Sequence, residues 1–140
     1  MLFPSKTKYR KAHRNRGSFK GKAFRGSTIT FGTYALKALD RGEINSRQIE
    51  AARRAISHSI KRGGKVWIRI FPQKAITRKA AEVPMGAGKG SVEFYVAQIK
   101  PGRILFEMDG VTEEIAKKAL TIAKHKLPLK CKIVVAEQIN

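Results

Sequence analysis

Arginine and lysine are the residues whose types and spacing in this sequence point to a chemistry, and that chemistry is the binding of phosphate groups. The clearest row contains Arg47, Arg54 and Lys61, which follow one another at intervals of seven, and Arg53 lies beside them. Seven residues make about two helical turns, so these side chains share one helix face. An arginine fork binds phosphate oxygens bidentately, and a lysine binds them as a compact charge. The row predicts a polyanionic partner.

A helix beginning near residue 45 is predicted to position this row. Asn45 and Gln48 have the spacing of a capping box, which satisfies two backbone N–H groups at a helix start. Gly63 and Gly64 are expected to supply a left-handed C-cap and a tight turn. The helix face opposite the cations should pack on a sheet. Its members are Ile49, Ala52, Ile56 and Ile60.

Alternating residues predict the sheet. Residues 65–71 should form a half-buried strand with Val66, Ile68 and Ile70 on one face and Trp67, Arg69 and Phe71 on the other. Further strands are expected at residues 27–33, 91–99, 103–108 and 130–135, and the turn Pro101–Gly102 predicts a β-hairpin between the middle two.

A second helix is expected after Asp109–Gly110, with Glu113 and Glu114 in its first turn and Pro128 beyond its end. Its buried face should comprise Ile115, Ala116, Ala119, Leu120, Ile122 and Ala123. The predicted class is α+β, with four or five mostly antiparallel strands and two helices on one face.

Charge is concentrated in one part of the chain. The 140 residues contain 30 Lys and Arg and 10 acids, a net charge of +20. Residues 1–90 carry 22 of these cations and four acids, whereas residues 91–140 carry eight and six. This length indicates a single domain, 1–140. We therefore expect the first part to bind a polyanion and the second mainly to fold.

Two segments are expected to lie outside the compact fold. Residues 1–25 form a basic arm with nine cations and no acid, in which Tyr9, His13, Phe19 and Phe24 could stack on bases. A transit peptide or a solvated tail are the alternatives for this arm. Residues 72–90 form a long basic connection that ends in the run Gly86–Gly90, and a loop of that length is usually functional or disordered.

Several chemistries are excluded. The glycine run is not a phosphate-binding P-loop, because Val83 and Gly90 stand where that motif needs glycine and Ser or Thr. His13, His58 and His125 lie in three separate segments, so neither a metal, a cofactor nor a catalytic site is expected. One cysteine cannot form an internal disulfide, and no apolar run of ~18 residues could span a membrane.

Five segments together resemble the bacterial-type large-subunit ribosomal proteins of the L-sixteen family. They are MLFPSKTKYRKAHR at the start, RQIEAARRA (47–55), KRGGKVWIRIFP (61–72), MGAGKG (85–90) and KPGRILFEMDGV (100–111). The resemblance implies an α+β protein that binds large-subunit rRNA near the peptidyl-transferase centre and contacts A-site tRNA. A contact with P-site tRNA is left open. It also implies a role in subunit assembly, neighbouring ribosomal proteins as partners, and a place in the large subunit of a cytoplasmic or organellar ribosome. Neither a membrane nor a homo-oligomer is expected.

Two positions depart from the family pattern. Many members have cations where this sequence has Pro84 and Ala87, so the loop tip Met85–Gly90 carries less charge here than in those members.

The resemblance also implies which residues face RNA. The RNA-facing positions are Lys6, Lys8, Arg10, Lys11, His13, Arg14 and Arg16 in the arm, Arg47, Arg53, Arg54, Lys61 and Arg62 on and after the helix, and Arg78, Lys79, Met85, Gly86, Gly88, Lys89 and Gly90 in the loop.

Two other functions remain as alternatives. A nucleic-acid-binding regulator that acts off the ribosome would carry the same charge. An RNA-modifying enzyme would need a cluster of acids or histidines, which the sequence lacks.

Overall fold

The computed structural model describes residues 26–61, 63–78 and 91–136, and over these ranges the chain forms two antiparallel sheets and two helices. The first sheet has the strand order β3-β6-β1-β7, and the second has the order β2-β5-β4. The predicted α+β class with antiparallel strands and two helices is confirmed, but the described residues form more strands than the four or five predicted, and these strands lie in two sheets. The elements are β1 Tyr34–Ala38, β2 Gly42–Asn45, α1 Ser46–Ile60, β3 Lys65–Ile68, β4 Lys74–Arg78, β5 Ser91–Ile99, β6 Ile104–Asp109, α2 Glu113–Lys124 and β7 Cys131–Val135.

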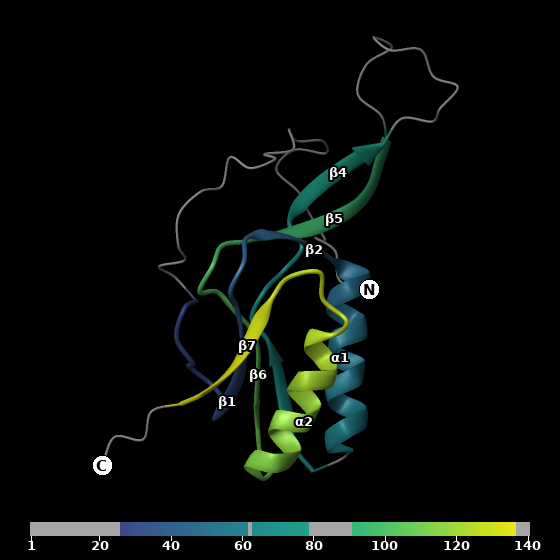
Figure 1. Cartoon of the computed structure of the whole chain (residues 1–140). Helices are drawn as coiled ribbons and strands as arrows, with labels where there is room; N and C mark the ends of the chain where they lie inside the picture. The colour runs from purple at the N-terminus through teal and green to yellow at the C-terminus, as the bar shows by residue number, and fades with distance from the viewer. Residues whose placement is uncertain (1–25, 62, 79–90, 137–140) are drawn as a thin grey trace.

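The four-stranded sheet separates two layers. The helices α1 and α2 pack against each other and against one face of the sheet, and the segment 26–33 runs along the other side (Figure 1). The strand predicted at residues 65–71 ends at Ile68. Within it the predicted alternation explains why the helices pack on this face, because Val66 and Ile68 face them. Trp67, between them in sequence, faces the other side.

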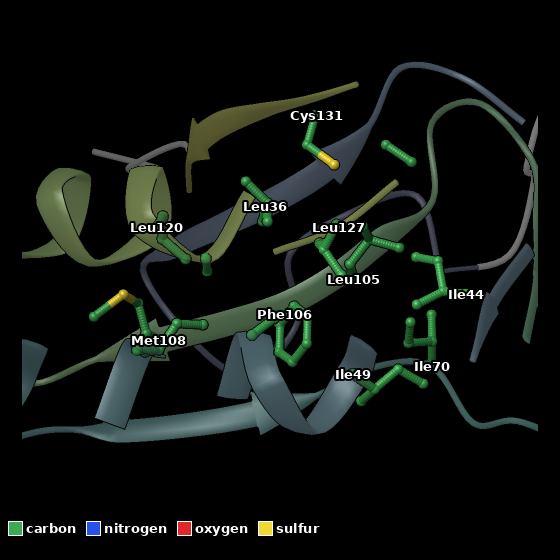
Figure 2. Packing of buried hydrophobic residues seen from close by; sticks show 14 of the residues in the cluster. Leu36, Ile44, Ile49, Ile70, Leu105, Phe106, Met108, Leu120, Leu127 and Cys131 are labelled. Atoms are coloured by element: carbon green, nitrogen blue, oxygen red, sulfur yellow. The ribbon is translucent and has the colours of Figure 1, made fainter. Parts of the chain in front are cut away.

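The core fills the space between the sheet and the helices. It joins Phe106 and Met108 of β6 to side chains of both helices, with Leu120 of α2 beside Met108 in Figure 2. Each fully buried side chain of this size contributes roughly 1.5–3 kcal/mol. The helix face predicted for α1 is confirmed, since its apolar members are all buried: Ile49, Ala52, Ile56 and Ile60.

The second sheet adjoins the start of α1. Asn45 at the end of β2 lies in register with Val96 of β5, and Val96 lies in register with Lys74 of β4. Strands β4 and β5 then leave the body of the molecule as a two-stranded ribbon (Figure 1). The prediction of a structureless connection from residue 72 is therefore wrong over residues 74–78, where Ala75 and Ile76 are buried and pair with β5.

The predicted β-hairpin between residues 91–99 and 103–108 is wrong. Pro101–Gly102 does form a turn, and Gly102 adopts a left-handed φ of 95°. However, β5 pairs with β2 and β4, whereas β6 pairs with β1 and β3. The turn thus connects two sheets, because each strand finds its partners among segments distant in sequence.

The strand expected at residues 27–33 begins later, at Tyr34. The N–H groups of residues 30–32 donate to a side chain, the carboxylate of Glu107, instead of to a neighbouring strand. This segment crosses the sheet and does not extend it.

The helix ends are partly as predicted. The capping box of α1 is confirmed, with Asn45 and Gln48 exchanging hydrogen bonds of 2.9 Å. At its C-terminus the left-handed residue is Lys61, with a φ of 54°, so the predicted glycine C-cap is wrong. Gly64 serves a different need, because a Cβ there would lie 2.7 Å from the carbonyl oxygen of Asp109.

The buried face predicted for α2 is too broad. Ala116, Ala119, Leu120 and Ala123 are buried, as expected, but Ile115 and Ile122 are 42% and 37% exposed. Small alanines let α2 approach α1 and the sheet closely, so the two isoleucines at the edges of the stripe remain outside.

Candidate nucleic-acid interface

The solvent face of α1 carries the predicted row of cations. Arg47 and Arg54 are exposed on the side of α1 opposite Ile49 and Ile56, which are fully buried. Arg53 is half-buried at the edge of that face, and the exposed Lys61 follows the helix as its C-cap. We call these four residues, Arg47, Arg53, Arg54 and Lys61, the cation row. The helix holds it rigidly, because the opposite face is fixed in the core.

One carboxylate orients the middle of this row. Glu50 accepts hydrogen bonds from Arg53 Nη2 at 2.5 Å and Arg53 Nε at 3.0 Å, and from Arg54 Nε at 3.3 Å. The bond from Arg53, together with the charges of both arginines, lowers the pKa of Glu50 to about 2 against the cost of its desolvation. Glu50 therefore stays ionised and holds two guanidinium groups side by side. With four cations and one anion, the row keeps a net positive charge.

The row continues toward the second sheet. Arg47 lies in the first turn of α1, two residues after Asn45, and the register places Asn45, Val96 and Lys74 in one line across β2, β5 and β4. Lys74 is partly exposed and begins β4, and Arg78 is the last residue of that strand. The structure therefore brings the helix and the base of the predicted loop together, which sequence spacing did not indicate.

Many predicted RNA-facing positions lie outside the described residues, and they stay predictions. These are Lys6, Lys8, Arg10, Lys11, His13, Arg14, Arg16, Arg62, Lys79, Met85, Gly86, Gly88, Lys89 and Gly90.

A second charged group, on the other side of the sheet, was missed by sequence reasoning. Glu107 is fully buried, and its Oε1 accepts hydrogen bonds from the backbone N–H groups of residues 30, 31 and 32 at 3.1, 2.8 and 2.8 Å. Its Oε2 is paired with Arg69. Burial of this carboxyl group opposes its ionisation, but the donated hydrogen bonds outweigh that cost and lower its pKa. The sequence signal that could have revealed this residue is an acid inside the otherwise apolar strand at residues 104–108.

Two further contacts complete this group. Arg103 donates a hydrogen bond of 2.7 Å to the backbone oxygen of Arg69, and burial together with the charge of Arg69 lowers the pKa of Arg103. The Arg69 guanidinium lies 5.2 Å from the centre of the Phe31 ring, which also stacks on Trp67. The segment before β1 is thus fixed on the sheet.

The single cysteine of the sequence is buried and is not activated. Burial raises the pKa of the Cys131 thiol to about 11, so it is not a nucleophile at neutral pH. Within the described ranges, no three His, Cys, Asp or Glu side chains come together as metal ligands would, and neither helix has the length and apolar character needed to cross a bilayer. What the α1 surface can do is bind phosphates through arginines and lysines held in place.

Comparison with known proteins agrees with this arrangement. The family model of ribosomal protein L16p/L10e matches residues 4–134. The large ribosomal subunit protein uL16 of Psychrobacter arcticus is 58% identical over 134 residues, which cover 96% of each chain. The residues matched by the family model include both helices, the cation row and every strand except the last residue of β7. The chain therefore belongs to the ribosomal protein L16p/L10e family, whose members are structural, non-enzymatic proteins of the large ribosomal subunit.

Proposed function

We propose that this protein binds the rRNA of the large subunit through the cation row and the adjoining β4–β5 ribbon. The observation that carries the proposal is a set of arginines on one solvent face of α1, fixed by a buried opposite face and by Glu50. Preorganised guanidinium groups lose little side-chain entropy when they bind phosphates bidentately.

The binding is non-catalytic. The cations neutralise RNA phosphates where folded strands approach each other, and the shape of the RNA supplies the specificity. The arm and the tip Met85–Gly90 are proposed to extend this contact toward the peptidyl-transferase centre and A-site tRNA. The support for this part is the family resemblance and the position of Arg78 at the end of β4.

Replacing Arg54 with Glu tests the proposal. Arg54 is 69% exposed, so Arg54→Glu should change the free energy of unfolding by less than about 0.5 kcal/mol. It should nevertheless weaken binding to a large-subunit rRNA fragment and lower the slope of affinity against salt. If ~6–10 phosphates are contacted, the wild-type affinity should fall roughly 10³- to 10⁵-fold between 50 and 200 mM salt.

Lys118→Glu is the matched control, because Lys118 is an exposed lysine on α2 and the change in net charge is the same. Filter binding measures both variants, and binding of A-site tRNA is measured in subunits reconstituted with each. Equal losses from Lys118→Glu and Arg54→Glu would mean that total charge, and not the cation row, determines binding. A flat salt dependence of the wild type would contradict phosphate binding altogether.

A further inference from the structure

The sheet face turned away from the helices carries a second set of cations and aromatic rings. We call it the outer sheet face and define it by Phe31, Lys37, Trp67, Arg69 and Lys132. The strand order β3-β6-β1-β7 puts Trp67 and Lys132 on the two edge strands. With neighbouring strands about 4.8 Å apart, the surface between them is roughly 14 Å wide.

Phe31 carries an aromatic ring that two contacts hold in place while most of the residue stays exposed. Its ring stacks on Trp67 with the centroids 6.1 Å apart and an angle of 22° between the planes. Trp67 and Arg69 are two residues apart in extended chain, so both meet Phe31 from the side of the sheet. Even so, Phe31 is 57% exposed, more than any other large apolar side chain in the described residues.

Glu107 keeps this ring in position. Its carboxylate binds the N–H group of Phe31 itself at 2.8 Å and is also paired with Arg69, which lies over the same ring. Because Glu107 is buried on β6, the backbone and the ring of Phe31 are both tied to the sheet. A rigid aromatic ring loses little entropy when a flat ligand stacks on it.

Lysines of like charge face each other on the same surface. Lys37 of β1 lies in register with Lys132 of β7, and side chains directly opposite on an antiparallel pair share one face of the sheet. The other register neighbour of Lys37 is Ile104, which is not acidic. Two lysines placed opposite each other destabilise a sheet, and an anion between them would relieve this repulsion.

We propose that the outer sheet face is a second RNA-binding surface, which takes an unpaired nucleotide: its base stacks on Phe31 and the neighbouring phosphates contact Lys37 and Lys132. This rests on the proposed RNA-binding function and adds a site on the side opposite the cation row (Figure 1). The chemistry fits single-stranded RNA, because every base has a face for stacking and sheets that bind such RNA use aromatic side chains on an open face. A folded protein partner would instead have to place acidic side chains opposite Lys37 and Lys132 and an apolar patch over the ring of Phe31.

Trp67 supplies a local signal for a direct test, because it is the only tryptophan in the sequence. The full-length protein is titrated with a six-nucleotide RNA too short to pair, and the fluorescence of Trp67 is followed. A saturable change in the fluorescence of Trp67 is expected. Phe31→Leu should lower the affinity for the RNA about tenfold, the loss expected for one stacked base. Phe31→Tyr keeps the ring and should bind as the wild type does.

A second variant does not depend on the aromatic stack. Lys132→Glu removes the repulsion with Lys37, so it should raise the melting temperature while it lowers the affinity for the same RNA. A variant that is more stable yet binds less tightly cannot be explained by misfolding. Unchanged affinity in both Phe31→Leu and Lys132→Glu would overturn the proposal.

Arg54→Glu separates the two surfaces. It should weaken binding of the rRNA fragment but leave the Trp67 titration with the short RNA unchanged. If Arg54→Glu abolishes the Trp67 signal and Phe31→Leu does not, all binding goes through the cation row, and the second site is overturned while the proposed function stands.

Cross-linking in the assembled large subunit identifies the occupant. A photoreactive p-benzoylphenylalanine replaces Phe31, with the same replacement of the exposed Ile115 on α2 as the control. A cross-link from position 31 to an rRNA nucleotide that position 115 does not reach is expected. A cross-link from position 31 to a neighbouring protein, or to the basic arm of this chain, would overturn the proposal.

Discussion

Two pairings of glutamate with arginine lie on opposite sides of the protein and differ in what surrounds them. Glu50 on α1 binds Arg53 and Arg54 at the surface, and 22% of its side chain is exposed. Glu107 on β6 is fully buried and binds Arg69 together with three backbone N–H groups. The first pairing leaves both arginines in reach of solvent, whereas the second fixes a segment of backbone on the sheet.

The comparison shows that burial decides what such a pairing contributes. An exposed ion pair is screened by water and salt and is worth about 0–1 kcal/mol, so Glu50 mainly sets the direction of two guanidinium groups. A buried carboxylate has exchanged water for fixed donors, and loss of either partner leaves the other without solvation. Glu107 is therefore a structural residue that also positions Phe31.

The largest expected effect is that of Glu107→Ala. This change leaves Arg69 and the N–H groups of residues 30–32 without their acceptor, and we expect a loss of roughly 3–5 kcal/mol in the free energy of unfolding. Urea denaturation measures it. Glu107→Gln keeps an oxygen that can accept the N–H bonds and should lose clearly less. A loss below ~1 kcal/mol for Glu107→Ala would show that the buried pairing contributes no more to the free energy of unfolding than the surface pairing does.

The pH dependence of stability should differ between the two pairings. Both carboxyl groups have a pKa below the ordinary value of 4.5, so each adds stability that is present above pH ~4.5 and lost as the pH falls through its folded-state pKa. For Glu50 that window extends down to about pH 2. Because its pair is exposed and screened, we expect most of the loss to come from Glu107.

Urea denaturation at several pH values between 3 and 7 can check this. Glu107→Gln should flatten the fall in stability below pH 4.5, and the full loss due to Glu107 should be of the order of a hydrogen bond to a charged group, roughly 1.5–3 kcal/mol. Glu50→Gln should follow the wild-type profile closely. The opposite result would show that the surface pairing, and not the buried one, governs acid unfolding.

The smallest expected effect on stability is that of Glu50→Gln, below ~0.5 kcal/mol for pairs three and four residues apart on a helix. Its effect on binding should be larger, because Arg53 and Arg54 lose the carboxylate that orients them. We expect rRNA affinity to fall by up to about fivefold, equivalent to the ~1 kcal/mol of side-chain entropy that the pairing no longer removes beforehand. A rise in affinity would show that Glu50 competes with phosphates for the arginines, and it would contradict the preorganisation argument.

Predictions from local patterns succeeded and those that needed distant partners failed. The capping box at Asn45 and the buried stripe of α1 depend on residues three or four apart, and both are confirmed. The hairpin predicted across Pro101–Gly102 assumed that neighbours in sequence pair in space, yet β5 and β6 belong to different sheets. Alternation reports that a strand has two faces, but it does not identify the strand beside it.

The candidate site divides in the same way. The spacing of Arg47 and Arg54 was sufficient to put both on one helix face, because the helical repeat is fixed by the backbone. Lys61 was expected on the same face, but the helix ends at Ile60 and Lys61 is its left-handed C-cap. Nothing in the spacing indicated that Phe31, Arg69 and Glu107 meet, since they come from three segments joined only by the packing of β3, β6 and the chain before β1.

The sequence by itself determined the charge of this protein, the start and the buried face of α1, the presence of a second helix, and membership of a family of ribosomal proteins. The tertiary structure alone decided which strands pair, that Ile115 and Ile122 stay exposed, and that a buried carboxylate holds an open aromatic ring on the outer sheet face. The physical reason is the range of the interactions. Helical periodicity and capping act over a few residues, whereas strand pairing and the solvation of a buried charge depend on groups that only the folded chain brings together.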